Sequence, residues 1–325
     1  MKVLVVGGAG YIGSHVVRAL RQRGHQPLIY DNLSTGHERL ARGFDLRVAD
    51  LSDTATLSKS LKGCDAVMHF AAHAYVGESV QNPRKYFYNN VQNGLQLLHA
   101  MLDTGVLRII FSSTCAVYGA PDKVPITEDM PRLPVNPYGV TKLTFEQALE
   151  AYESAYGLRF AALRYFNAAG ADSAGEIGEL HAPETHLIPV IFRAITGHGP
   201  GLEVFGEDYP TPDGTCIRDY IHVSDLAEAH VLALEFLESS PRLAVNLGTG
   251  RGYSVKEVIA AVEEVTGRRV PRSVGARRVG DPPVLVSNPT RAQQLLDWQA
   301  KFSLREMVIT GWRWHQSAIA AGVVP

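Results

Sequence analysis

Short apolar runs alternate along this chain with longer stretches in which apolar residues recur at helical spacing. The runs predict strands at residues 3–6, 26–30, 45–48, 66–70, 108–111 and 160–164. The stretches predict helices at residues 11–23, 54–61, 86–104, 138–156, 254–266 and 304–320. Strand–helix alternation with right-handed crossovers indicates an α/β protein with a Rossmann-like, doubly wound parallel sheet covered by helices on both faces.

The pattern changes after Asn167. Residues 168–186 and 197–215 are rich in Gly, Pro, Asp and His, with only short elements between them. Long irregular stretches inside a compact chain are usually functional loops. We therefore expect a first domain over residues 1–167 and a smaller α/β domain over residues 168–325, partly interwoven with the first.

Composition excludes several kinds of partner. The chain has 325 residues, 46% of them hydrophobic, and a net charge of −2, so nucleic acid is not expected as a partner. The chain has no run of about 18 apolar residues, so no membrane helix is expected. The predicted strand directly after Met1 leaves no room for a signal peptide. Three widely spaced cysteines fit a reducing compartment, which predicts a cytoplasmic protein, and offer no metal-ligand spacing, so no metal site is expected.

A glycine-rich turn is the first candidate for chemistry. Gly7, Gly10 and Gly13 follow the first predicted strand and open the first helix. Such glycines let backbone N–H groups approach a dinucleotide pyrophosphate at the helix N-terminus. Asp31 ends the second strand, where a carboxylate accepts from ribose hydroxyls and repels a 2′-phosphate, so NAD is favoured over NADP. The alternative is an ordinary strand–turn–helix.

The end of the third predicted strand is a second candidate for cofactor contact. Asp50 and Leu51 stand there and could reach the adenine. A plain turn that caps the next helix is the alternative for the same residues.

A tyrosine and a lysine four residues apart predict proton transfer. Tyr138 and Lys142 would share one helix face, and Thr114 stands upstream at a strand exit. A free tyrosine has a pKa of about 10, but a neighbouring ammonium and a positively charged nicotinamide would favour the phenolate. Thr114 would hydrogen-bond the same substrate oxygen. An exposed helix pair is the alternative, and the NAD loop makes it the weaker one.

These motifs resemble the extended short-chain dehydrogenase/reductase family, and within it the UDP-glucose 4-epimerases. The likeness runs from Gly7 to His315. The Tyr/Lys core is common to the whole superfamily, whereas residues 209–215 and 218–223 are much more specific to the epimerases. The stretches that carry the resemblance are residues 7–15, 31–33, 76–80, 138–142, 163–167, 204–215, 218–223 and 311–315.

The resemblance implies an NAD-dependent epimerisation at C4 of a UDP-hexose, through a transient 4-keto sugar. Tyr138 would take the proton from the 4-hydroxyl while hydride passes to the bound NAD. The keto sugar would turn about its diphosphate link. The hydride and the proton would then return to the opposite face of the sugar. In this scheme the first domain binds NAD and the second binds the UDP-sugar, and the helices at 86–104 and 138–156 form the interface of a homodimer.

The resemblance also assigns individual site residues. For Phe70 and Phe166, core packing is as good an interpretation as cofactor contact. Arginine suits the substrate diphosphate because its guanidinium is bidentate and always charged. The further cofactor residues implied are Tyr11, Ile12, Asn32, Phe70, Ala71, Ala72, Asn89 and Phe166. The substrate residues implied are Thr114, Asn167, His186, Val204, Phe205, Arg218, Arg278, Asp281 and Leu285.

Some assigned positions depart from the family or have other interpretations. Thr114 replaces a serine but keeps the hydroxyl, and Ala74 stands where some members have a lysine. His186 stands where others have asparagine and is equally well a simple loop histidine. Leu285 is intermediate in size at a position thought to set the width of the sugar pocket, so UDP-GlcNAc stays open. Arg218 could instead pair with a neighbouring carboxylate, Asp219 or Asp225.

Three rival functions follow. A nucleotide-sugar 4,6-dehydratase needs a carboxyl pair directly after Thr114, where this chain has Cys115 and Ala116. An epimerase for another UDP-sugar, such as UDP-GlcNAc, a glucuronate or a pentose, is not excluded. A non-catalytic NAD-binding sensor would have no need of the proton-transfer residues.

Overall fold

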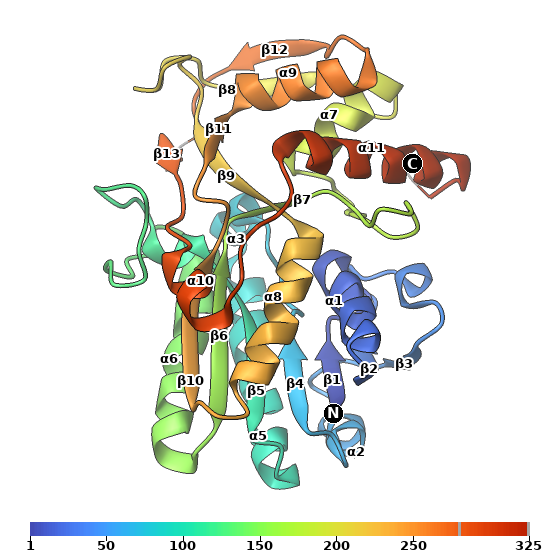
Figure 1. The fold of residues 1–325 in the computed structure, drawn as a ribbon, viewed down its shortest axis with the longest axis vertical. Coiled ribbons are helices and arrows are strands. Elements are labelled where there is room, and N and C mark those ends of the chain that lie inside the picture. Colours follow the sequence, from blue (N-terminus) through green and yellow to red (C-terminus); the bar gives the residue numbers. More distant parts are fainter. Residues whose placement is uncertain (279–280, 324–325) are drawn as a thin grey trace.

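A seven-stranded parallel sheet organises the molecule (Figure 1). The computed structural model describes residues 1–278 and 281–323. The strand order is β10-β6-β5-β4-β1-β2-β3, and every neighbouring pair is parallel. The strands are β1 Lys2–Val6, β2 Gln26–Asp31, β3 Asp45–Val48, β4 Ala66–His69, β5 Arg108–Thr114, β6 Arg159–Tyr165 and β10 Arg242–Leu247. The expected Rossmann-like α/β fold is confirmed.

The strand order fixes where a ligand can bind. The chain builds outward from β1 through β2 to β3, and then returns to the other side of β1 with β4. In open α/β sheets, the crevice for a ligand opens at such a reversal, outside the carboxyl ends of the strands. The glycine turn after β1 and the end of β4 meet at that place, since Ala71 N donates to Val6 O at 3.1 Å.

Alternating strand residues supply two hydrophobic layers. Val3 and Val5 face one layer, and Leu4 and Val6 face the other. The first layer packs against α1 and α8, which lie side by side in Figure 1, and the second against α2, α5 and α6. Strands buried on both faces read as continuous apolar runs, which is why they stand out in the sequence. These helices are α1 Tyr11–Gln22, α8 Val223–Phe236, α2 Thr54–Leu61, α5 Asn93–Thr104 and α6 Pro137–Tyr156.

A smaller group of elements lies beyond the carboxyl ends of the large sheet (Figure 1). One small sheet has the order β11-β9-β13, with β7 also paired to β9, and β8 pairs with β12. A separate hydrophobic cluster joins them to α7, α9 and α11. The strands are β7 Asn167–Ala169, β8 Leu202–Phe205, β9 Ile217–His222, β11 Gly252–Ser254, β12 Arg272–Gly275 and β13 Val284–Leu285. The helices are α7 Leu187–Thr196, α9 Val255–Thr266 and α11 Leu304–Ala320.

The predicted elements match the observed ones with two informative differences. The helices over 54–61 and 304–320 have the predicted bounds. Strand β5 runs to Thr114, so Thr114 ends the strand rather than following it. The helix predicted over 86–104 is interrupted by a π-helical segment, Phe87–Gln92, before α5. Inside that segment Asn90 donates to His73 O at 3.0 Å and to Thr141 Oγ1 at 3.1 Å, long-range bonds that helical periodicity does not reveal.

The later half of the chain contributes to both groups of elements. Strand β10 and helix α8 belong with the large sheet, although both come after residue 167. They are followed by β11 and α9, which belong with the smaller group. A division into domains after residue 167 therefore stays a prediction, with interweaving as its main feature.

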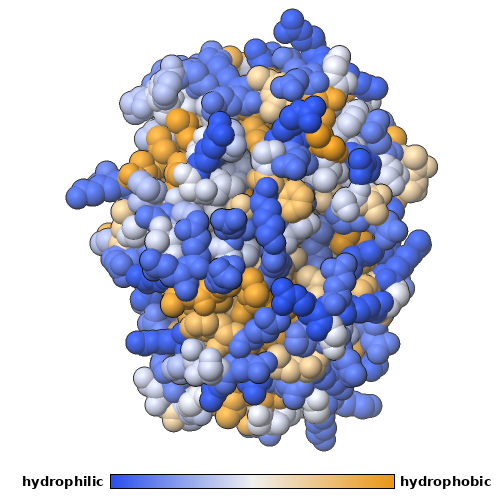
Figure 2. Space-filling model, in the orientation of Figure 1, coloured by the Kyte–Doolittle hydropathy of each residue, from blue (hydrophilic) through white to orange (hydrophobic). Residues whose placement is uncertain are grey.

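The outer surface is mixed in character. Figure 2 shows apolar residues gathered in separate patches, divided by polar and charged ones. Within residues 1–278 and 281–323, no helix combines the length and apolar character needed to cross a bilayer.

Asp219 ties the two groups of elements together. It lies fully buried on β9, and its carboxylate accepts hydrogen bonds from Thr249 N at 2.9 Å, Gly250 N at 3.1 Å and Ser287 N at 3.1 Å. Gly248 and Thr249 directly follow β10, so this one side chain fixes the exit of the large sheet to the small sheet. Removal of a buried carboxylate that accepts this many hydrogen bonds leaves all of the donor groups unpaired.

We therefore expect Asp219→Ala to lower the free energy of unfolding by about 3–5 kcal/mol, because buried N–H groups lose their acceptor. Urea unfolding followed by circular dichroism measures this. Asp129→Ala, which removes an exposed carboxylate paired with Arg291, is the control and should cost less than about 1 kcal/mol. Equal losses in both variants would contradict the role given to Asp219.

Candidate active site

Three predicted catalytic side chains meet at the carboxyl end of β5. Asn136 accepts from Gly139 N at 2.9 Å and begins α6, with Pro137 in its first turn, so Tyr138 lies at the start of the helix. The hydroxyl of Thr114, the last residue of β5, lies close enough to that of Tyr138 to lower the pKa of the phenol. One turn further along α6, Lys142 Nζ lies 5.9 Å from the centroid of the Tyr138 ring.

A backbone carbonyl positions the lysine. Lys142 is buried, and its Nζ donates to Ser112 O at 2.7 Å. This bond joins α6 to β5 two residues before Thr114. The spacing of four residues predicts the shared helix face, but the strand carbonyl that holds the amino group comes only from the fold.

Burial dominates the ionisation of the pair. It raises the pKa of Tyr138 to about 12, with the hydrogen bond from Thr114 acting in the opposite direction. Burial also lowers the pKa of Lys142 to about 7, partly offset by the charge of Glu146. The protein by itself therefore keeps Tyr138 protonated at neutral pH. The phenolate expected from the sequence needs the second cation, the nicotinamide ring, as well as the lysine.

A buried ion pair lies one turn beyond Lys142. Glu146 accepts from Arg164 Nε at 3.0 Å and from its Nη2 at 2.7 Å, and Ser113 Oγ also donates to it. Arg164 in turn donates to Tyr118 OH at 2.9 Å. These polar contacts hold α6, β5 and β6 in a fixed relation around the lysine. Sequence reasoning missed them, because partners 18 to 46 residues apart carry no local signal.

The glycine turn leaves no room for side chains at two of its positions. Gly7 has φ +82°, and a Cβ there would lie 2.5 Å from Ala71 N. A Cβ on Gly13 would lie 2.2 Å from Gly7 O. Among the described side chains, none caps the N-terminus of α1 at Gly10, so the N–H groups of Tyr11 and the next residues remain available to an anion. These residues fit a dinucleotide.

Asp31 ends β2 beside this turn. Its carboxylate accepts from Ala9 N and Leu33 N, each at 2.9 Å, and it is largely buried, which raises its pKa. A carboxylate has about four acceptor positions, so two remain for ribose hydroxyls. The backbone bonds fix the direction in which those positions point.

Three more predicted cofactor residues, Asn32, Asp50 and Asn89, line a cavity of about 510 Å³. Asn32 Nδ2 donates to Asp50 Oδ2 at 2.6 Å. Asp50 accepts from Ser52 N at 2.9 Å in a turn before α2, whose cap is Asp53, so the plain-turn alternative for Asp50 stays open beside cofactor contact. The cavity is also lined by Ser34, His73, Asn82, Arg84, Lys85, Tyr88 and Asn93.

The apolar cofactor candidates differ in how far they are buried. Leu51 and Phe166 are buried in hydrophobic clusters. Phe70 is partly buried, with its ring 4.8 Å from that of His230. Ile12, Ala71 and Ala72 lie on or beside the glycine turn and are partly exposed. Packing therefore accounts for Leu51 and Phe166, and their contact with NAD stays a prediction.

Four predicted substrate residues form one cluster within the smaller group of elements. Arg278 Nε donates to Asp281 Oδ2 at 2.9 Å, and its guanidinium carbon lies 5.1 Å from the centroid of the Phe205 ring. Arg218 Nη2 lies 3.8 Å from Asp281 Oδ1. Its alternative pairing with Asp219 or Asp225 is not found, since those carboxylates accept from backbone groups instead. The partner of Arg218 is another predicted substrate residue.

The remaining substrate residues occupy different surroundings. Strand alternation on β8 buries Val204 in the core and exposes Phe205, so only the backbone of Val204 could reach a uracil. Asn167 begins β7 and pairs with Tyr220 on β9. Leu285 on β13 pairs with Arg218 and packs beside Phe166.

His186 belongs to a polar cluster. Its Nδ1 contacts the carboxylate of Glu179, and His181 and Glu184 complete the group. Sequence reasoning missed these partners, because it searched for metal-ligand spacing among cysteines alone. The spacing of two glutamates and two histidines within eight residues was the available signal.

Cys115 also lies in the site. Burial raises its pKa to about 11, and the charge of Arg218 acts in the opposite direction. The thiol is close enough to Tyr138 to affect the pKa of the phenol. Its position after Thr114 was the only signal in the sequence.

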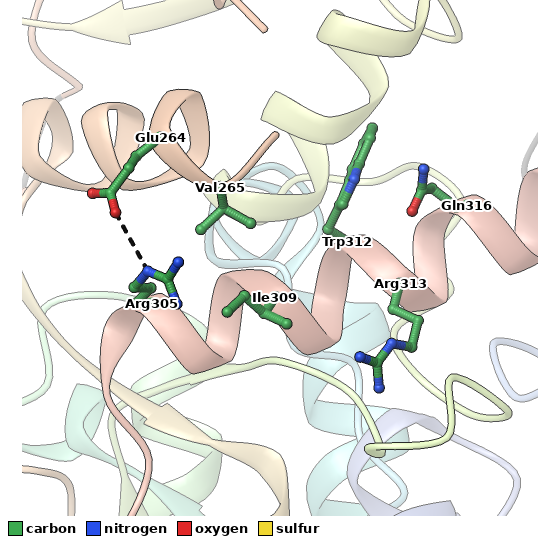
Figure 3. A pocket seen from close by; sticks show the side chains of 7 residues that line it. All are labelled: Glu264, Val265, Arg305, Ile309, Trp312, Arg313 and Gln316. Atoms are coloured by element: carbon green, nitrogen blue, oxygen red, sulfur yellow. Dashed lines mark hydrogen bonds and ion pairs between the residues drawn. The ribbon is translucent and has the colours of Figure 1, made fainter. Parts of the chain in front are cut away.

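A second hollow, of about 370 Å³, lies between α9 and α11 (Figure 3). Arg305 and Glu264 pair across it, and Trp312 and Arg313 of α11 are among the residues that line it. It contains none of the predicted site residues.

Comparison with known proteins agrees with this geometry. Residues 3–248 match the model of the NAD dependent epimerase/dehydratase family. The chain belongs to this family. It is 49% identical over 316 residues to a UDP-glucose 4-epimerase from Rhizobium meliloti, covering 96% of each chain.

Solved structures extend the likeness to three dimensions. UDP-glucose 4-epimerase from Brucella ovis in complex with NAD superposes with a TM-score of 0.94 at 52% identity, covering 96% of this chain and 97% of that one. The enzyme from Bifidobacterium longum in complex with NAD⁺ and UDP has a TM-score of 0.93 at 36% identity, covering 98% of each chain.

We expect Gly7→Ala to lower NAD affinity at least tenfold, or about 1.4 kcal/mol, because the new methyl group displaces the backbone at Ala71. Fluorescence titration of cofactor-stripped protein measures the affinity. Gly24→Ala is the matched control, because Gly24 has φ +81° but no heavy atom within 4 Å of the added Cβ. Both variants carry the same backbone strain, so an equal loss of affinity would contradict a specific role for the turn.

Proposed function

We propose that this protein interconverts UDP-galactose and UDP-glucose by NAD-dependent epimerisation at C4 of the sugar. The observation that carries the proposal is the meeting of Thr114, Tyr138 and Lys142 at the end of β5, on the edge of the sheet where the glycine turn opens. The relatives named UDP-glucose 4-epimerase support the choice of sugar.

The glycine turn and Asp31 would hold NAD, which would supply a reversible acceptor for hydride, so the reaction would involve no net oxidation. The protein's part is to hold and move a proton. Tyr138 accepts it from the 4-hydroxyl and later returns it, while Thr114 fixes the sugar oxygen. Because burial raises the pKa of Tyr138 to about 12, a proton returns readily to the phenolate, and this suits a group that must act as base and then as acid.

The group around Asp281 is suited to anchoring the UDP. Arg218 and Arg278 offer two cations to a diphosphate, and Phe205 offers an exposed aromatic face to a base. Asp281 holds both guanidinium groups in place. An anchor at the nucleotide leaves the sugar free to turn, which the change of face at C4 requires.

Rival functions fit the site less well. Cys115 and Ala116 begin a short helix after Thr114 and offer no carboxyl group for dehydration. A complete proton-transfer set argues against a non-catalytic NAD-binding sensor. A 4-epimerase of another UDP-sugar remains the main alternative, with Leu285 beside Arg218 as the position to test.

Purified protein should convert UDP-galactose to UDP-glucose without added NAD, and Tyr138→Phe should lower kcat by about 10²–10⁴-fold because the proton loses its acceptor. A coupled assay for UDP-glucose measures this. Tyr156→Phe is the control, since Tyr156 is 57% exposed at the end of the same helix. Full activity in Tyr138→Phe would overturn the proposed mechanism.

A panel of UDP-glucose, UDP-GlcNAc, UDP-glucuronate and UDP-xylose separates the alternatives. Epimerisation of the hexose pair at the highest kcat/KM supports the proposal. A higher kcat/KM on another member of the panel assigns that sugar instead. A 4-keto-6-deoxy product would identify a dehydratase.

We also propose a homodimer formed by α5, α6 and the π-helical segment between α4 Pro83–Tyr86 and α5. Phe87 and Tyr88 of that segment, and Tyr156 on α6, are exposed although they are large and apolar. Light scattering should give twice the mass of 35.4 kDa, and Tyr88→Glu with Tyr156→Glu should give monomers, because buried charges destabilise an interface. A monomeric parent protein would contradict the dimer.

The three free cysteines support a cytoplasmic location.

A further inference from the structure

Two glutamates and two histidines converge in the segment between β7 and α7. Glu179, His181, Glu184 and His186 each offer one ligand atom, and all four atoms lie within 4.8 Å of one another. Glu179 Oε1 lies 3.0 Å from His181 Nδ1, and His186 Nδ1 lies 3.6 Å from Glu184 Oε1. The proposed epimerisation uses at most one of these residues, so the cluster needs its own explanation.

The size of the cluster suits one metal ion. Zinc–nitrogen and zinc–oxygen bonds are about 2.0–2.2 Å long, so donor atoms around one ion lie roughly 3.3–3.6 Å apart in a tetrahedron. Contraction from the observed spread therefore requires shifts of roughly an ångström or less. Two imidazoles with two carboxylates favour a transition metal such as zinc over magnesium or calcium.

The carboxylates are buried and held in position. The side chains of Glu179 and Glu184 are only 7% and 6% exposed. Thr185 N and His186 N donate to Glu184 Oε1 at 2.8 and 2.9 Å, and Trp314 Nε1 donates to Glu179 O at 2.9 Å. Two adjacent buried carboxylates require two positive charges nearby.

One imidazole nitrogen of the cluster has no directed hydrogen bond. His181 Nδ1 is buried and has no hydrogen-bond partner among the described residues, although Glu179 Oε1 lies only 3.0 Å away. A nitrogen near two carboxylates without a directed hydrogen bond is available as a metal ligand.

We propose that Glu179, His181, Glu184 and His186 bind one divalent cation of the zinc class. Four protein ligands leave no open position, so the ion is structural rather than catalytic. Its two positive charges balance those of the two buried carboxylates. This inference is independent of the proposed reaction.

The position of the cluster indicates which part of the structure the ion would stabilise. Tyr11 lies at the start of α1, beside the glycine turn. Its hydroxyl donates to Gly170 O at 2.6 Å, and the ring of Tyr75 lies 6.0 Å from that of His181. The ion would fix the loop of residues 170–186 against the cofactor-binding edge.

Metal content of the full chain, purified without a histidine tag, tests the site. After treatment with EDTA and dialysis, Co²⁺ should bind at one equivalent per chain, with the visible absorption of a four-coordinate ion, and Zn²⁺ should displace it. Zn²⁺ should also raise the melting temperature of the protein, because a ligand that binds only the folded state stabilises it.

His181→Gln and Glu179→Gln should each weaken Co²⁺ binding by more than about 100-fold. Loss of a metal ligand lowers metal affinity more than loss of a residue that only hydrogen-bonds to a ligand. Glu176→Gln is the matched control, because this exposed glutamate of the same loop pairs with Arg18 outside the cluster. It should bind Co²⁺ like the parent protein. Circular dichroism and bound NAD check that each variant is folded.

His186→Gln provides a second test if a buried substitution prevents folding, because His186 is 46% exposed. It should also lose tight Co²⁺ binding. The proposal is overturned if the parent protein takes up no equivalent of Co²⁺, or if the folded His181 or His186 variant binds as tightly as the parent. The cluster would then be an ion-pair network of protonated histidines.

Discussion

The bond from Lys142 Nζ to Ser112 O is the contact on which the active edge depends. It is made in the interior, where an amino group must have a partner, and it joins the first turns of α6 to the last residues of β5. Because Thr114 ends that strand and Tyr138 begins that helix, the same bond determines how the two hydroxyls meet. The buried Glu146–Arg164 pair secures the opposite side of this junction.

The interior that positions the proton-transfer groups also opposes their ionisation. Burial raises the pKa of Tyr138 and lowers that of Lys142, so neither takes its charged form readily. A site built in this way becomes a base only when an additional positive charge arrives. In the proposed epimerisation this would couple proton transfer to the oxidised cofactor, in a reaction that must run in both directions without releasing its intermediate.

Local chemistry could be predicted because each of its signals lies within a few residues. The turn from Gly7 to Gly13 and the pair Tyr138 and Lys142 needed only short spacings and their neighbouring strands. Partners of long range could not be predicted. Asp281 rather than Asp219 pairs with Arg218, and Val204 faces the core while Phe205 faces outward. Such choices depend on which strands become neighbours, and no local pattern records that.

The sequence by itself determined the parallel α/β sheet, the glycine turn after its first strand and the shared helix face of Tyr138 and Lys142, because periodicity and short motifs fix local conformation. Only the tertiary structure decided which distant groups share a site. It placed β10 and α8 with the first sheet, used Asp219 to link the two lobes, and brought two glutamates and two histidines together beside Tyr11. These contacts arise from burial, which forces polar groups far apart in the chain to satisfy one another.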